Sequence, residues 1–142
     1  ITKLATQSGL KRDTIINYLS YLDKAKLIRL LYSDLKNIKR MQKPDKIYID
    51  NTNLLNAWAT APIQIGTIRE TFVANQLSVN HVVEFRKTNG DFLVDSKYTF
   101  EVGGDDKDFQ QIANVADSFI LADDMETAIG KKLPIWVVGF DY

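Results

Sequence analysis

The sequence predicts a mixed α/β protein (α+β), in which a small basic helical module precedes a mixed β-sheet with helices on its faces. Apolar residues recur at helical spacing near the start, and short strand-like runs crowd the second half. Charge is divided as well: residues 1–50 carry eleven Lys or Arg against five Asp or Glu, and residues 51–142 carry seven against thirteen. Such a division is expected when one module faces a polyanion such as nucleic acid, or when the two halves attract each other.

The composition excludes several classes of site. The chain has 142 residues, of which 45% are hydrophobic, and this is typical of a globular protein. It has no cysteine and a single histidine, His81, so disulfides and thiolate metal sites are excluded and oxygen atoms would have to hold any metal. No apolar run approaches the ~20 residues that span a bilayer, and no signal-peptide pattern occurs, so we expect a cytoplasmic protein with no membrane partner.

The first 25 residues match a helix-turn-helix pattern. Ala5 is small enough for close helix contact, Gly9 can adopt the positive φ of a tight turn, and Ile15 supplies a branched apolar side chain for the core. We expect the second helix to turn side chains suited to phosphates and base edges away from that core. They are Lys11, Arg12, Thr14, Asn17, Tyr18 and Tyr21.

Residues 27–50 then predict a wing, so that residues 1–61 form a winged-helix domain. Strand-like runs at 27–32 and 46–50 flank a polar, basic loop. This wing and the second helix could straddle a DNA backbone; the alternative is a fold used only for packing. A short helix with Trp58 in the core would end the domain before Pro62. The predicted nucleic-acid contacts are Lys11, Arg12, Asn17, Lys36, Lys39, Arg40 and Lys43.

Residues 62–142 predict a second, α/β domain. The order is one helix, three strands, a second helix and further strands, which is the order of the restriction-endonuclease-like core, a mixed β-sheet flanked by helices. The first helix runs through Ile68, Phe72 and Leu77. The predicted strands cover residues 82–86, 91–94, 98–102, 118–122 and 134–140, and the second helix passes through Phe109, Ile112 and Val115.

The central strands carry the outline of a two-carboxylate metal site. Asp91 and Glu101 stand at matching points of a predicted β-hairpin, as in the (D)…(D/E)xK nucleases, where such a pair binds Mg²⁺ and a lysine two residues after the Glu assists the chemistry. Here that position is Gly103. Lys97 and Lys107 are the candidates to replace the lysine, and Gln110 or Gln111 could touch a phosphate.

Glu70 on the preceding helix would complete a cluster of three carboxylates around one Mg²⁺. The predicted catalytic set is therefore Glu70, Asp91, Glu101 and Lys107, with Asp91 and Glu101 as metal ligands. Each acid also has an ordinary explanation, as a turn residue beside a glycine, as the partner of a nearby cation, or as an edge-strand carboxylate. The chain has no P-loop pattern, so it cannot bind ATP in that way.

Taken together, these motifs resemble the C-terminal region of a family of bacterial and archaeal AAA-type ATPases, which carry a winged helix followed by a restriction-endonuclease-like domain. The resemblance covers essentially the whole chain. It is carried by the turn at Gly9, the Lys-x-Tyr-x-Asp strand at 46–50, the Glu-Thr-Phe-Val helix at 70–73, and the runs at 91–94 and 100–102. Many members keep a lysine after the Glu-Val, where this chain has Gly103-Gly104.

The resemblance implies an ATPase core before Ile1, which would hold the ATP and be a partner of this region. We expect an accessory, non-catalytic region that needs no cofactor of its own and binds DNA or another protein. The alternative is a divergent Mg²⁺-dependent DNA nuclease that uses the three carboxylates.

Overall fold

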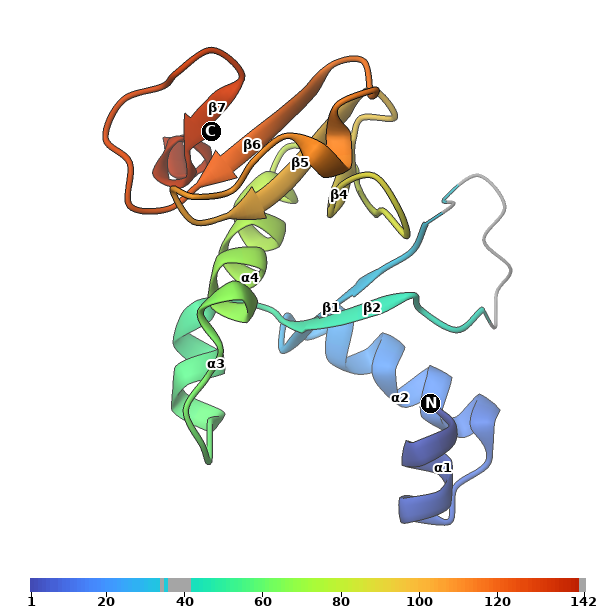
Figure 1. The fold of residues 1–142 in the computed structure, drawn as a ribbon. Helices are drawn as coiled ribbons and strands as arrows, with labels where there is room; N and C mark the ends of the chain where they lie inside the picture. The colour runs from blue at the N-terminus through green and yellow to red at the C-terminus, as the bar shows by residue number, and fades with distance from the viewer. Residues whose placement is uncertain (34, 36–41, 141–142) are drawn as a thin grey trace.

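The computed structural model describes residues 1–33, 35 and 42–140 (Figure 1). No helix in these ranges is both long and apolar enough to cross a membrane. The α-helices are α1 (Thr2–Ser8), α2 (Arg12–Lys24), α3 (Thr52–Trp58) and α4 (Ile65–Leu77), and short 3₁₀ helices follow as η1 (Gln110–Ile112) and η2 (Ile135–Phe140). The strands are β1 (Ile28–Leu31), β2 (Lys46–Ile49), β3 (Val83–Phe85), β4 (Phe92–Val94), β5 (Tyr98–Gly103), β6 (Ser118–Ala122) and β7 (Lys132–Pro134).

The two N-terminal helices meet at Gly9, as the sequence predicts. Gly9 has a φ of 68° and donates its N–H to the carbonyl of Ala5, 3.0 Å away, which ends α1 in a left-handed cap. Helix α2 buries Ile15 and Leu19 against Ile28 of β1, so its apolar face forms a small separate core. Its opposite face is exposed to solvent.

A two-stranded antiparallel sheet links this module to the rest of the chain. β1 pairs with β2 from Ile28 opposite Ile49 to Leu31 opposite Lys46. Because side chains alternate along a strand, Ile49 packs toward the small core while Tyr48 turns to the other side, where it is only 4% exposed. Tyr48 joins the main hydrophobic core and donates its hydroxyl to Glu70 on α4, at 2.6 Å.

The second sheet is mixed, with strands in the order β3-β4-β5-β6-β7. β3, β4 and β5 are antiparallel neighbours, whereas β6 runs parallel to both β5 and β7. Helix α4 packs on one face, where Val73, Phe92 and Leu121 are fully buried together. Ile112 of η1 covers the other face against Ile120. The α+β class predicted by the sequence is therefore confirmed.

Three expectations for individual elements are wrong. Residues 135–140 form the 3₁₀ helix η2, not a strand, and the two buried residues of η2, Ile135 and Val138, have the three-residue spacing of a 3₁₀ turn. The predicted helix through Phe109 shrinks to η1, and the chain then reaches β6 through a turn in which Asp117 has a positive φ of 49°, a conformation that an α-helix does not contain. Trp58 is 50% exposed and plugs no core.

We predict that Tyr48→Phe lowers the free energy of unfolding by about 1–2 kcal/mol, because it removes a buried hydroxyl that donates to a charged carboxylate. Urea denaturation followed by circular dichroism measures this value. The matched control is Tyr21→Phe, since the ring of Tyr21 is 61% exposed. Equal stability of the two variants would show that the bond between Tyr48 and Glu70 contributes nothing.

A candidate carboxylate and lysine site

Asp91 and Glu101 lie opposite each other on neighbouring strands. Phe92 of β4 faces Phe100 of β5 in an antiparallel register, so one step further along each strand Asp91 faces Glu101. The Asp91 N–H donates to the carbonyl of Phe100 at 2.8 Å and continues the ladder. Glu101 lies beside Ile120, on the sheet face that η1 covers. The sequence placed this pair correctly because a hairpin register is a local property.

Glu101 is almost completely buried, with 2% of its surface exposed, and both of its carboxylate oxygens have partners. The Lys107 ammonium forms an ion pair with one oxygen. The Gln111 amide nitrogen, in the orientation that satisfies its hydrogen bonds, donates to both oxygens, at 2.8 and 3.2 Å. A buried charge is tolerated only with such compensation, so the turn that carries Lys107 and the start of η1 are tied to β5.

The glycine at position 103 makes room for Lys107. A Cβ atom added to Gly103 would lie 2.8–2.9 Å from Cβ, Cγ and Cδ of Lys107, closer than carbon atoms can approach. The Lys107 side chain therefore passes directly over the Gly103 backbone on its way to Glu101. Partial burial acts to lower the pKa of Lys107, but the charges of Glu101 and Asp91 outweigh it and raise the pKa above its ordinary value.

Of the two lysines that the sequence proposes as replacements, only Lys107 reaches the carboxylates. Lys97 comes just before β5, at the end of that strand remote from Glu101. Its ammonium lies 4.7 Å from the centre of the Tyr98 ring and 3.1 Å from the Tyr98 hydroxyl. Sequence alone could not separate the two candidates, because both lie within six residues of Glu101.

Asp91 has a strongly perturbed acidity. Its Oδ2 accepts the Val102 N–H at 2.8 Å. Burial raises the pKa of Asp91 to about 6, with the charges of Glu101 and Glu70 adding to the effect and the Val102 hydrogen bond and Lys107 opposing it. A carboxyl group that changes protonation near neutral pH beside an ion pair is a functional-site candidate with a physical basis.

Glu70 faces β2 instead of completing a metal cluster. Its Oε2 accepts the Tyr48 hydroxyl at 2.6 Å and the Lys46 ammonium at 3.1 Å. In the described part of the chain, no group of three or more acidic or histidine side chains is placed to hold a metal ion. The three-carboxylate convergence expected from the sequence is therefore not seen. The missed signal was the alternation Lys46-x-Tyr48, which directs both side chains to the same side of β2.

The donor set that remains still fits Mg²⁺. Asp91 and Glu101 offer the hard carboxylate oxygens that this ion prefers. The sequence has no cysteine, and its single histidine, His81, belongs to another part of the chain. Mg²⁺ is commonly held by one or two carboxylates, with water and substrate phosphates filling the other positions. Two opposed carboxylates match that number, and Glu101 would share its oxygens between the metal ion, Lys107 and Gln111.

The residues predicted to contact nucleic acid divide into two groups. Lys11, Arg12 and Asn17 are exposed along α2, and Lys43 is exposed just before β2. Arg12 lies 3.6 Å from Asp13, a surface pair that leaves its guanidinium accessible. Lys36, Lys39 and Arg40 lie outside the described residues.

Comparison of the chain with protein-family models, curated proteins and solved structures found no match. Asp91, Glu101 and Lys107 are therefore described by their geometry alone.

We predict that Asp91→Asn changes how stability depends on pH. The folded pKa of Asp91 is raised above its unfolded value, so its contribution to stability is present below about pH 4 and is lost as the pH rises through about 6. Relative to wild type, the variant should therefore gain on the order of 2 kcal/mol between these limits, because its amide cannot ionise. Denaturant unfolding at a series of pH values measures the difference.

Asp95→Asn is the control for that experiment. Hydrogen bonds from Val82 and His81 lower the pKa of Asp95, so its stabilising effect is instead lost as the pH falls below about 4. The two variants should deviate from wild type with opposite signs. Parallel curves for wild type and Asp91→Asn between pH 4 and 6 would contradict the assignment.

Proposed function

We propose that residues 62–142 form a divergent Mg²⁺-dependent nuclease site that hydrolyses phosphodiester bonds in nucleic acid. The observation that supports this most is the path of Lys107, which crosses Gly103 and brings an ammonium to Glu101. The absence of a lysine at position 103 is the main objection raised by the sequence. A lysine that approaches from the following turn answers that objection, because the chemistry requires the charge at a point in space and not at a point in the chain.

The order of elements also supports the proposal. Helix α4 is followed by the antiparallel strands β3, β4 and β5, and β6 returns parallel to β5. This is the order expected of a restriction-endonuclease-like sheet, with the two carboxylates on its central strands. We propose that fold for residues 62–142 and a winged helix for residues 1–61.

Each residue has a definite role in the proposed reaction. Asp91 and Glu101 would hold the Mg²⁺ ion, which when bound supplies Lewis-acid polarisation of the scissile phosphate and a water of lowered pKa. The Lys107 ammonium would stabilise negative charge that develops on the phosphoryl oxygens. Gln111 fixes the orientation of the Glu101 carboxylate through its amide. Tyr48 and Lys46 engage one oxygen of Glu70, so in this proposal Glu70 positions α4 and is not a metal ligand.

Cleavage of a fluorescent oligonucleotide tests this function. Wild-type protein with Mg²⁺ or Mn²⁺ should cleave it, and Lys107→Met should slow the reaction about 100-fold or more, the usual effect of removing one charge-stabilising donor. Asp91→Asn should abolish metal-dependent cleavage. Lys97→Met, which removes the lysine near Tyr98, should leave the rate unchanged.

A pair of glycine variants separates the position of Lys107 from its chemistry. Gly103→Ala would push the Lys107 side chain off its path and should slow cleavage, whereas Gly66→Ala adds a methyl group with no atom within 4 Å and should not. No cleavage with either metal, or full activity in Lys107→Met, would reject the nuclease and leave the second candidate.

The second candidate is a non-catalytic accessory region of an AAA-type ATPase that binds DNA through α2. The observation in its favour is the exposed surface of that helix, where cations at its start are followed by aromatic rings. Tyr18 and Tyr21 are 52% and 61% exposed, and their ring centres lie 6.5 Å apart. Lys11 and Arg12 stand exposed at the start of the same helix. Basic and aromatic side chains on one helix suit phosphates and base edges.

Fluorescence anisotropy with a labelled DNA duplex tests the second candidate. The double variant Lys11→Glu and Arg12→Glu should weaken binding at least tenfold and flatten its dependence on salt concentration, because each phosphate contact contributes about one unit to that slope. Lys131→Glu, on the acidic half of the chain, is the control. Unchanged binding in the double variant would show that α2 does not contact DNA.

A further inference from the structure

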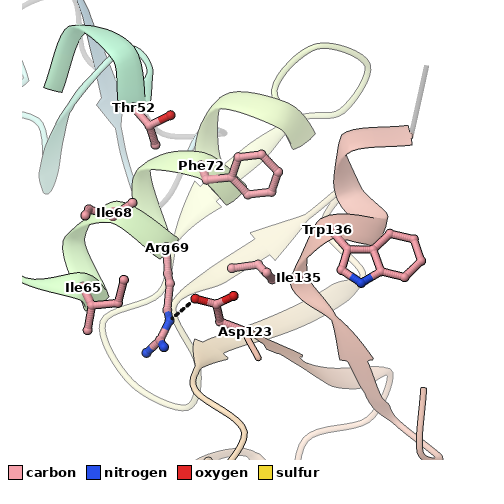
Figure 2. A pocket seen from close by; sticks show the side chains of 8 residues that line it. All are labelled: Thr52, Ile65, Ile68, Arg69, Phe72, Asp123, Ile135 and Trp136. Carbon is pink, nitrogen blue, oxygen red and sulfur yellow. Dashed lines mark hydrogen bonds and ion pairs between the residues drawn. The ribbon is translucent and has the colours of Figure 1, made fainter. Parts of the chain in front are cut away.

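The sheet and its covering helices leave an apolar hollow of about 260 Å³ that is lined by none of Asp91, Glu101 and Lys107 (Figure 2). It opens between the first half of α4, the end of β6 and the start of η2. In Figure 2, Ile135 and Phe72 point into it from opposite walls. The lining residues are Thr52, Ile65, Ile68, Arg69, Phe72, Asp123, Ile135 and Trp136.

Arg69 and Asp123 balance each other's charge in the lining of this hollow, and Asp124 beside them leaves a small local excess of negative charge. Arg69 donates to Asp123 at 3.1 Å and also lies 3.6 Å from Asp124. One cation thus faces two carboxylates, and the Asp124 side chain is 76% exposed. The polar part of the wall is already engaged in ion pairs. The hollow therefore suits an apolar group whose neighbours are positively charged.

Large apolar side chains at the hollow remain about half exposed to solvent, although the Trp136 ring also packs edge-on against Phe140. Ile65 is 53% exposed and Trp136 is 48% exposed, and the two belong to elements distant in sequence that meet at this one place. Exposed apolar surface gathered around a concave site is typical of an interaction surface.

The chain itself contains a segment with the complementary chemistry. Leu10 is 39% exposed in the turn between α1 and α2, and Lys11 and Arg12 follow it directly. The left-handed conformation of Gly9 turns the chain at this point and separates Leu10 from α1. We call the exposed Leu10 side chain, with Lys11 and Arg12 after it, the knob. The charge division agrees, since residues 1–50 have a surplus of six positive charges and residues 51–142 a surplus of six negative charges.

The knob and the hollow of one chain do not meet. Figure 1 shows the turn between α1 and α2 at one end of the molecule, with β1 and β2 between it and the sheet that carries η2. Contact between them must therefore be intermolecular. We propose that the hollow receives the Leu10 turn of a second copy of this chain, with Lys11 and Arg12 beside Asp123 and Asp124.

This contact is head to tail, so a pair of copies keeps one free knob, on one copy, and one free hollow, on the other. Such heterologous contacts build rings or open filaments and not closed two-fold dimers. A cavity of about 150 Å³ already accepts a benzene-sized group, so one branched aliphatic side chain fits the hollow. The proposal uses none of Asp91, Glu101 or Lys107 and stands independently of the proposed nuclease.

Analytical ultracentrifugation of wild type and two single variants tests it. At low salt the wild-type average mass should rise with concentration beyond that of a dimer, and about 1 M salt should reduce the association, because the Debye length falls to about 3 Å. Leu10→Asp removes the knob, and Ile65→Lys disables the hollow. Each variant alone should associate at least tenfold more weakly than wild type.

Mixing the two variants gives the sharpest result. The intact knob of Ile65→Lys should enter the intact hollow of Leu10→Asp and form a 1:1 dimer that grows no further. The control is Val79→Lys, which changes a residue that is 66% exposed but does not line the hollow, and it should associate like wild type. A wild type that stays monomeric, single variants that associate normally, or a mixture that forms no dimer would each overturn the proposal.

Discussion

A carboxylate buried at the centre of a sheet must find its positive partner inside the protein, and Glu101 is in that position. Its ion pair with Lys107 and its hydrogen bonds from Gln111 explain features that otherwise look unrelated. Position 103 has no side chain because the Lys107 stem occupies that space. The polar segment after β5 is drawn back over the strand, and η1 then closes the face with Ile112.

The ion pair between Glu101 and Lys107 also affects the pKa of Asp91. The Lys107 ammonium pairs with Glu101, Asp91 accepts a backbone hydrogen bond from Val102, and burial raises the pKa of Asp91. The two opposed carboxylates thus differ in their partners: Glu101 is paired with the Lys107 ammonium, whereas Asp91 accepts a backbone N–H and has a raised pKa.

A second polar contact holds the two parts of the chain together. Tyr48 and Lys46 of β2 share one oxygen of Glu70 on α4, and the Asn75 side chain donates to the carbonyl of Asp50. Because Tyr48 is also buried in the main core, the small helical module cannot rotate freely on the sheet. The exposed face of α2 and the carboxylate site therefore keep a constant position relative to each other.

The sequence by itself determined what depends on local periodicity and local pairing. The turn at Gly9, the α+β class, most of the strands and the opposition of Asp91 and Glu101 all follow from residues close together in the chain. Only the tertiary structure decided which lysine reaches Glu101, that Glu70 binds Tyr48, that Trp58 stays exposed and that residues 135–140 form a 3₁₀ helix. These outcomes depend on contacts between segments that are distant in the sequence. The local sequence does not distinguish the competing partners, and burial in the folded chain selects one of them.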